Sequence, residues 1–89
     1  MLDLSSAVIT NHAAEALRER NLSESTLRDA LEDPDQSQVV RPGRWVVQKM
    51  FRDRKAAKDY MLRVFVDVDR DPPEIVTVYR TSKITRYRG

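Results

Sequence analysis

The strongest constraint on the fold is the alternating stretch Tyr60–Asp69. A two-residue repeat is typical of a β-strand, because successive side chains point to opposite faces of the sheet. The stretch therefore predicts a strand with one face in the core and the other partly in water. The core set is Tyr60, Leu62, Val64, Val66 and Val68, and the alternate set is Met61, Arg63, Phe65, Asp67 and Asp69.

Three further stretches have the β-branched and aromatic composition of strands. They are Val39–Val40, Trp45–Phe51 and Glu74–Tyr79. The intervening segments are short and rich in turn-forming or charged residues, which favours antiparallel pairing of consecutive strands. Pro42-Gly43 favours a type II turn, whereas tight hairpins prefer the primed types, so a loop of more than two residues is an alternative there.

The first part of the chain predicts two helices. Thr10 or Asn11 can cap a helix that runs to about Arg20, because either side chain can accept from the amides of the first turn. Asn21 suits the left-handed residue that ends a helix, and Ser23 can cap a second helix over Glu24–Glu32.

Together these elements predict an α+β fold over residues 1–89, a single domain with two N-terminal helices packed on one face of a four-stranded antiparallel sheet. The other sheet face is then open, with Arg63, Phe65 and Tyr79 on it. Interleaved cations and aromatic rings can bind phosphates and unstacked bases. A dimer interface or a half-exposed sheet is the alternative for this face.

Charge is distributed unevenly along the chain. Residues 1–38 hold three basic and eight acidic side chains, a net charge of −5, and residues 39–89 hold thirteen and six, a net charge of +7. A surface built from the second part attracts polyanions, and RNA is the expected partner. The chain has no cysteine, which excludes disulfides and thiolate ligands, and its single histidine does not favour a metal site. We expect neither a metal nor a cofactor.

No apolar run approaches the length of a membrane span, and the first residues lack the features of a signal peptide. A cytoplasmic location without membrane association is therefore expected. The basic stretch that begins at Arg80 and includes Lys83, Arg86 and Arg88 follows directly on a strand. It is a candidate site, and a solvated basic terminus is the alternative.

Several short motifs carry a resemblance to a known bacterial family. They are His12-Ala13, Glu19–Ser23, Leu31–Pro34, Arg63–Val66 and Val76–Lys83. In this order they resemble the domain of unknown function 4258 family, which is allied to the BrnT-like toxins of the RelE-like superfamily. A glycine is usual in the family where this chain has Asn21, which can adopt the same left-handed turn. The resemblance implies the toxin of a toxin–antitoxin pair, with RNA cleavage as its activity and a cognate antitoxin as partner.

Metal-independent RNA cleavage needs a stabiliser for the phosphate charge and groups that transfer protons. Arg80 suits the first role because its planar guanidinium can bind two phosphate oxygens. Lys83 is a second phosphate contact or a base, and His12 is the proton shuttle whose ordinary pKa lies nearest neutrality. The alternative for His12 is a structural role at the helix start. The candidate catalytic residues are thus His12, Arg80 and Lys83.

The candidate nucleic-acid-binding residues are Arg52, Arg63, Phe65, Tyr79, Arg86 and Tyr87. Two functional classes remain open on the residues alone. One is a metal-independent endoribonuclease, and the other is a catalytically inert module that holds a partner protein or nucleic acid. A homodimer is a further alternative.

Overall fold

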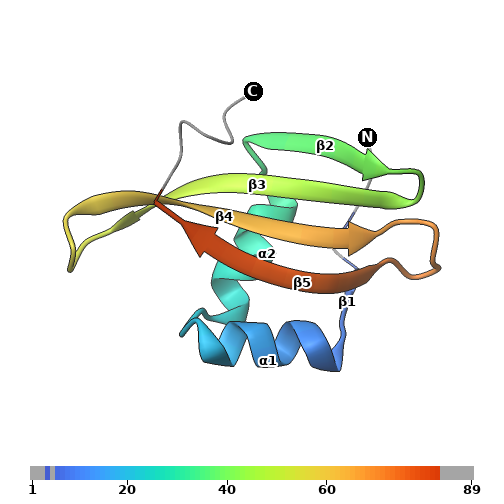
Figure 1. The fold of residues 1–89 in the computed structure, drawn as a ribbon, viewed down its shortest axis with the longest axis horizontal. Helices are drawn as coiled ribbons and strands as arrows, with labels where there is room; N and C mark the ends of the chain where they lie inside the picture. Colours follow the sequence, from blue (N-terminus) through green and yellow to red (C-terminus); the bar gives the residue numbers. More distant parts are fainter. Residues whose placement is uncertain (1–3, 5, 83–89) are drawn as a thin grey trace.

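The computed structural model describes residue 4 and residues 6–82 of the chain. Two helices lie on one face of a five-stranded mixed sheet with strand order β1-β5-β4-β3-β2, so the fold is α+β (Figure 1). The elements are β1 (Val8–Ile9), α1 (Asn11–Glu19), α2 (Glu24–Glu32), β2 (Gln36–Arg41), β3 (Arg44–Asp53), β4 (Lys58–Asp67) and β5 (Glu74–Thr81). Neither helix is long and apolar enough to cross a membrane.

The helix ends follow the predicted capping residues. The Thr10 hydroxyl accepts a hydrogen bond from the Ala13 amide at 3.2 Å, and the Ser23 hydroxyl accepts one from the Thr26 amide at 3.2 Å. Asn21 has a φ of 53°, the left-handed conformation that ends α1. The prediction of a two-helix hairpin is confirmed.

The prediction of a four-stranded antiparallel sheet was wrong in one respect. Strands β2 to β5 do form an antiparallel meander, but β1 adds a fifth strand that pairs parallel to β5, with Ile9 opposite Ile75. The Val8 amide donates to the Pro73 carbonyl at 2.8 Å. A strand of two residues is too short to show the two-residue alternation of side chains. Its pairing also joins segments more than sixty residues apart, so the sequence pattern did not reveal it.

The turn between β2 and β3 has two residues, Pro42 and Gly43, so the alternative of a longer loop was wrong. Gly43 has a φ of +84°, as the third residue of a type II turn requires. A Cβ built there would lie 2.6 Å from an Asp69 carboxylate oxygen. The register shift between Val39 and Arg41 accommodates this turn in the hairpin.

The core lies between the helices and one face of the sheet. Leu27 from α2, Leu62 and Val64 from β4 and Val78 from β5 are fully buried there. The alternation predicted for β4 is confirmed, because Leu62, Val64 and Val66 all face the helices.

We call the sheet face opposite the helices the second face. Its side chains include Arg63 and Phe65 from β4 and Tyr79 from β5, as the alternation predicts. The expectation that this face is open was wrong at its centre, where Val46 and Gln48 are each only 1% exposed and Met61 is 3% exposed. The long polar and aromatic side chains of this face bond to one another instead of extending into water.

Candidate nucleic-acid interface

The end of β5 extends past the helices that cover its beginning. Helix α1 starts beside Ile75, because the Thr10 hydroxyl donates to the Ile75 carbonyl at 2.7 Å. Nine helical residues span about 13.5 Å, whereas the eight residues of β5 span about 26 Å. The helix therefore covers about four residues of the strand beyond Ile75. Arg80, five residues beyond Ile75, lies past the covered part of the sheet.

Arg80 faces the helix side of the sheet and is exposed. It pairs with Leu62 of β4 and shares a face with Val78, two residues before it. Its guanidinium carbon lies 5.6 Å from the centre of the Tyr60 ring, and that ring stacks on Phe51 of β3 at 5.7 Å. A row formed by Phe51, Tyr60 and Arg80 thus crosses three strands at this end of the sheet.

A cationic pocket of about 620 Å³ surrounds this row, and we call it the Arg80 pocket. Its lining comes from the turn after α1, from the hairpin that joins β3 to β4, and from the end of β5. Four cationic side chains line it against a single carboxylate. The lining residues are Asn21, Arg52, Asp53, Arg54, Lys55, Ala56, Tyr60 and Arg80.

Two of the charged residues in the Arg80 pocket have partners within the hairpin. Arg52 forms an ion pair with Asp59 at 3.2 Å, and both side chains are more than half exposed. Asp53 Oδ1 accepts from the Lys55 and Ala56 amides at 3.0 and 3.2 Å, which fixes the turn. Arg80, by contrast, has no hydrogen bond or ion pair with any residue of the described part of the chain.

A smaller pocket of about 280 Å³ adjoins the Arg80 pocket and shares Asp53, Tyr60 and Arg80 with it. Asp53 and Asp59 contribute carboxylates to it, and Tyr60 contributes its phenol. Arg80 thus has proton-accepting groups within the same pocket. The full lining is Asp53, Lys58, Asp59, Tyr60, Arg80, Thr81 and Ser82.

Three predicted binding residues come together on the second face, away from Arg80. Arg63 Nε donates to Gln48 Oε1 at 2.7 Å, and its Nη1 donates to the Tyr79 hydroxyl. Its guanidinium carbon lies 5.4 Å from the centre of the Phe65 ring and 5.5 Å from that of Tyr79. The two rings stack at 5.9 Å. The predicted site is therefore divided between two faces of the sheet.

The structure does not bring His12 to Arg80. His12 is exposed in the first turn of α1, two residues after Thr10, which is bonded to Ile75. From Ile75 to Arg80 the strand advances about 16 Å, so the imidazole and the guanidinium are at opposite ends of β5. Proton transfer needs direct contact or a single bridging water, so His12 cannot act on a phosphate held by Arg80.

The predicted residues Lys83, Arg86 and Tyr87 lie outside the described residues. Sequence reasoning did not assign a functional role to Tyr60, Arg54 or Lys55. The alternation places Tyr60 on the core face, and the basic hairpin follows directly from the sequence. The missing information was the register of β4 against β5, which brings Arg80 beside Tyr60.

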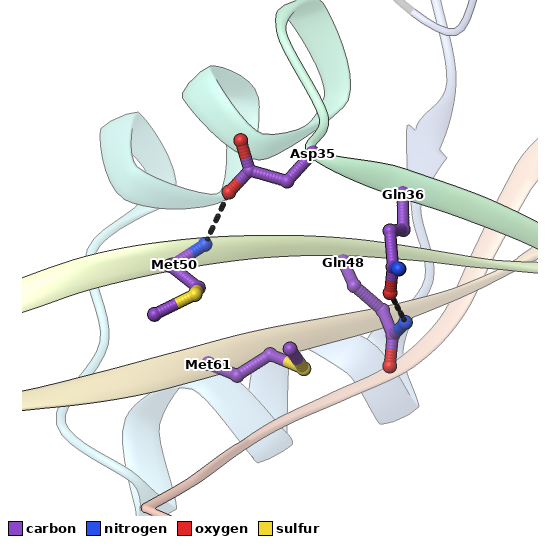
Figure 2. Close-up of a pocket in the computed structure, with 5 residues that line it drawn as sticks. All are labelled: Asp35, Gln36, Gln48, Met50 and Met61. Atoms are coloured by element: carbon purple, nitrogen blue, oxygen red, sulfur yellow. Dashed lines mark hydrogen bonds between the residues drawn. The ribbon is translucent and has the colours of Figure 1, made fainter. Parts of the chain in front are cut away.

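A third pocket, of about 320 Å³, lies where β2 begins (Figure 2). It is lined by Asp35, Gln36, Gln48, Met50 and Met61. Asp35 Oδ2 accepts from the Met50 amide at 2.8 Å, and Gln48 Nε2 donates to Gln36 Oε1 at 3.1 Å (Figure 2). The described residues that line this pocket include one carboxylate and no cation, in contrast to those of the Arg80 pocket.

At the opposite end of the sheet from the Arg80 pocket, Arg44 forms a bidentate ion pair with Asp67. Arg44 Nε and Nη2 donate to the two carboxylate oxygens at 2.7 and 3.2 Å. This hydrogen bonding holds the pKa of Asp67 below its ordinary value, against the opposing effect of burial. Asp67 therefore stays ionised in the folded protein at pH values where a free aspartate would begin to bind a proton.

Comparison with protein-family models gives one match, to the family described as Domain of unknown function (DUF4258), over residues 9–80. The chain belongs to this family. The resemblance drawn from the sequence motifs to this family is thus confirmed. The match extends from Ile9 in β1 to Arg80 and so includes every described residue that lines the Arg80 pocket. No curated protein and no solved structure matches the chain.

Proposed function

We propose that this DUF4258 protein binds single-stranded RNA in the Arg80 pocket and acts as the toxin of a toxin–antitoxin pair, with a BrnT-like, RelE-like fold. The observation that carries the proposal is Arg80 itself: an exposed guanidinium with no polar partner among the described residues, beside an aromatic ring and among three other cations. An RNA target agrees with the expected cytoplasmic location.

The pocket has the two components that sequence-independent binding of single strands requires. Arg54, Lys55 and Arg80 supply charge for backbone phosphates, and Tyr60 supplies a ring on which a base can stack. Stacking of one base on an aromatic side chain contributes about 1–3 kcal/mol in such proteins. The phosphate contacts make binding strongly dependent on salt, because counterions are released.

Cleavage by this pocket would proceed without a metal. The neighbouring 2′-oxygen would form a bond to phosphorus while the bond to the leaving 5′-oxygen breaks, and solvent water would supply the proton that the 5′-oxygen takes up. Arg80 would stabilise the charge that grows on the phosphate during this step. A carboxylate of the adjoining pocket, from Asp53 or Asp59, would accept the proton of that hydroxyl. Each carboxylate uses Oδ1 in its contacts within the hairpin, which leaves Oδ2 to accept the proton. His12 has no part in this scheme because it lies at the far end of β5.

The test is incubation of the purified protein with single-stranded RNA in excess chelator, beside Arg80→Ala and His12→Ala variants. We expect cleavage by the wild type and by His12→Ala, and no cleavage by Arg80→Ala. Cleavage that stops when chelator is added would contradict the metal-independent mechanism. RNA that binds but stays intact with wild-type protein would exclude the enzyme.

The distance between His12 and Arg80 favours a second candidate, a binding module that holds RNA without cleaving it. Such a module needs charge and aromatic area but no proton shuttle. It predicts salt-dependent binding to the Arg80 pocket with no change in the RNA. The same incubation, analysed for both bound and cleaved RNA, distinguishes the two candidates.

The antitoxin of the proposed pair would cover the Arg80 pocket with an acidic segment. An acidic partner would neutralise the four cations and exclude RNA from the same surface. Competition between RNA and the co-expressed partner for the wild-type protein tests this point. Simultaneous binding of both would show that the antitoxin acts elsewhere.

A further inference from the structure

The two outermost strands of the sheet differ greatly in length. On one side β1 contributes two residues, and on the other β2 contributes six (Figure 1). An edge strand presents unpaired backbone amides and carbonyls, which can pair with another strand. Within the described part of the chain β2 pairs only with β3. In the described chain β1 pairs only with Glu74 and Ile75 of β5, so the rest of β5 also has an open edge, and β2 is distinguished from it by its composition.

The composition of β2 is unusual for an exposed edge. Ser37, Gln38, Val39 and Val40 are all exposed and carry no charge, in a chain with 34% charged residues. Val39 is 59% exposed and Val40 is 50% exposed, the two largest values among the exposed large hydrophobic residues of the described part. Natural edge strands are commonly protected by lysine, proline or a bulge. Here the bulge and Arg41 protect only the last residues of the strand.

From this edge we infer a homodimer interface in which β2 pairs antiparallel with β2 of a second copy. The two sheets then join into one sheet across a twofold axis, with the helices of both copies on the same side. A register centred on Val39 brings the two Val39 side chains together and opposes no like charges over Ser37–Val40. Pairing at the edge adds backbone hydrogen bonds, and the four valines lose exposed apolar area.

A second copy fits this edge better than a foreign charged strand does. The segment Ser37–Val40 has no charge with which to select an acidic or basic partner. The partner strand has to be uncharged and apolar in its middle, and the chain itself provides such a strand. A twofold contact uses the same β2 edge in both copies, so the assembly closes at two copies.

The dimer is independent of the proposed RNA function. The Arg80 side chain comes from β5, three strands away from β2 in the sheet, or about 14 Å. Pairing through β2 thus leaves the Arg80 pocket accessible in both copies. Loss of the dimer does not imply loss of RNA binding, and absence of RNA binding does not count against the dimer.

The first test is the mass of the full chain in solution by sedimentation equilibrium over a range of concentrations. We expect a dimer for the wild type and a monomer for Val39→Lys, since the substitution places two ammonium groups opposite each other. Val8→Lys is the matched control, because Val8 is 46% exposed on the other edge of the sheet. It should remain a dimer. A monomeric wild type, or a Val39→Lys variant that stays dimeric, overturns the proposal.

The second test uses the absence of cysteine from the chain. Val39→Cys introduces one thiol on each side of the twofold axis, and facing residues of antiparallel strands lie within the Cα separation that a disulfide requires. Mild oxidation should produce a covalent dimer from Val39→Cys but not from Val8→Cys. Equal cross-linking of the two variants, or none from Val39→Cys, contradicts pairing through β2. This variant keeps the strand apolar, so it tests the interface even if the lysine variant does not fold.

Discussion

Two arginines of this protein occupy similar aromatic surroundings on opposite faces of the sheet. Arg63 lies over Phe65 and Tyr79 at 5.4 and 5.5 Å, and Arg80 lies over Tyr60 at 5.6 Å. Arg63 is half-buried and donates to Gln48 and Tyr79, whereas Arg80 is exposed without a polar partner in the described chain. Both arginines thus lie over an aromatic ring, and they differ in their hydrogen bonds. The bonded Arg63 has a structural role, whereas Arg80 is a candidate for ligand binding.

The position in the sheet explains this difference. Arg63 is in the middle of β4, between Gln48 of β3 and Tyr79 of β5. Neighbouring strands therefore supply acceptors for its donors. Arg80 is next to the last residue of β5, in the part of that strand with which β1 does not pair, and beyond the end of α1. An exposed strand end has fewer neighbours, so the guanidinium keeps its capacity to bind a ligand.

Removal of Arg80 should have the largest effect. Arg80→Ala is expected to lower RNA cleavage about a hundred- to a thousandfold, because one preorganised charge stabiliser is lost. The melting temperature should stay close to that of the wild type, since the side chain is exposed. Single-turnover cleavage and thermal melts measure the two quantities. A large loss of stability with Arg80→Ala would show that Arg80, like Arg63, has a structural role.

Removal of Arg63 should have the opposite pattern. Arg63→Ala leaves the buried Gln48 Oε1 without its donor, which costs about 1–3 kcal/mol of unfolding free energy. Denaturant titration measures the loss. RNA binding should be retained, and Arg63→Lys should recover part of the stability. Weaker RNA binding with unchanged stability would instead place Arg63 in the RNA-binding site together with the Arg80 pocket.

The hairpin cations should have smaller effects on binding. Lys55→Ala is expected to reduce the slope of log affinity against log salt by about 0.7, the value for one phosphate contact on a single strand. Fluorescence anisotropy with a labelled RNA at several salt concentrations measures the slope. Lys49→Ala is a suitable control, because Lys49 donates to the Asp33 carbonyl at 2.7 Å and is absent from the Arg80 pocket. Equal slopes for the Lys55→Ala variant and the wild type would exclude the hairpin from the interface.

The smallest effect concerns Arg44, which forms an ion pair with Asp67 instead of lying over an aromatic ring of the described chain. The bond from Arg44 lowers the pKa of Asp67 in the folded protein, so the pair stabilises the fold above the carboxyl pKa of the unfolded chain, about 3.9. That contribution is lost as the pH falls through the lowered pKa of the folded state. Thermal melts should show a weaker acid dependence for Asp67→Asn than for the wild type. An identical acid dependence would show that the pair does not contribute.

The family and most of the elements were predictable from the sequence, because local patterns carry that information. The alternation from Tyr60 to Val68 identified β4 and its core face, and Thr10, Asn21 and Ser23 marked the helix ends. Negative charge at the C-terminal end of a helix is unfavourable to the helix dipole, so the acidic residues at the end of α2 need partners elsewhere. In the structure its Asp33 accepts from Lys49, and Asp35 caps the Met50 amide. Both contacts join segments that are distant in sequence.

The candidate site was only half predictable. The sequence identified Arg80 as a cation at a strand end and Arg52 as part of a basic loop. It also joined Arg80 with Arg63, Phe65 and Tyr79 in one site, although these residues lie on opposite faces. His12 was included for its ordinary pKa alone, and its position depended on how α1 lies along β5.

The sequence by itself determined the period of each element, the residues that cap and turn the chain, and the concentration of positive charge after Gln38. These properties depend on near neighbours along the backbone. The tertiary structure alone decided which arginine received hydrogen bonds, how far α1 covers β5, and that β1 pairs with the beginning of β5 while β2 forms the opposite edge of the sheet. The reason is geometric: strand register and the ratio of helix rise to strand rise act between residues that no local pattern connects.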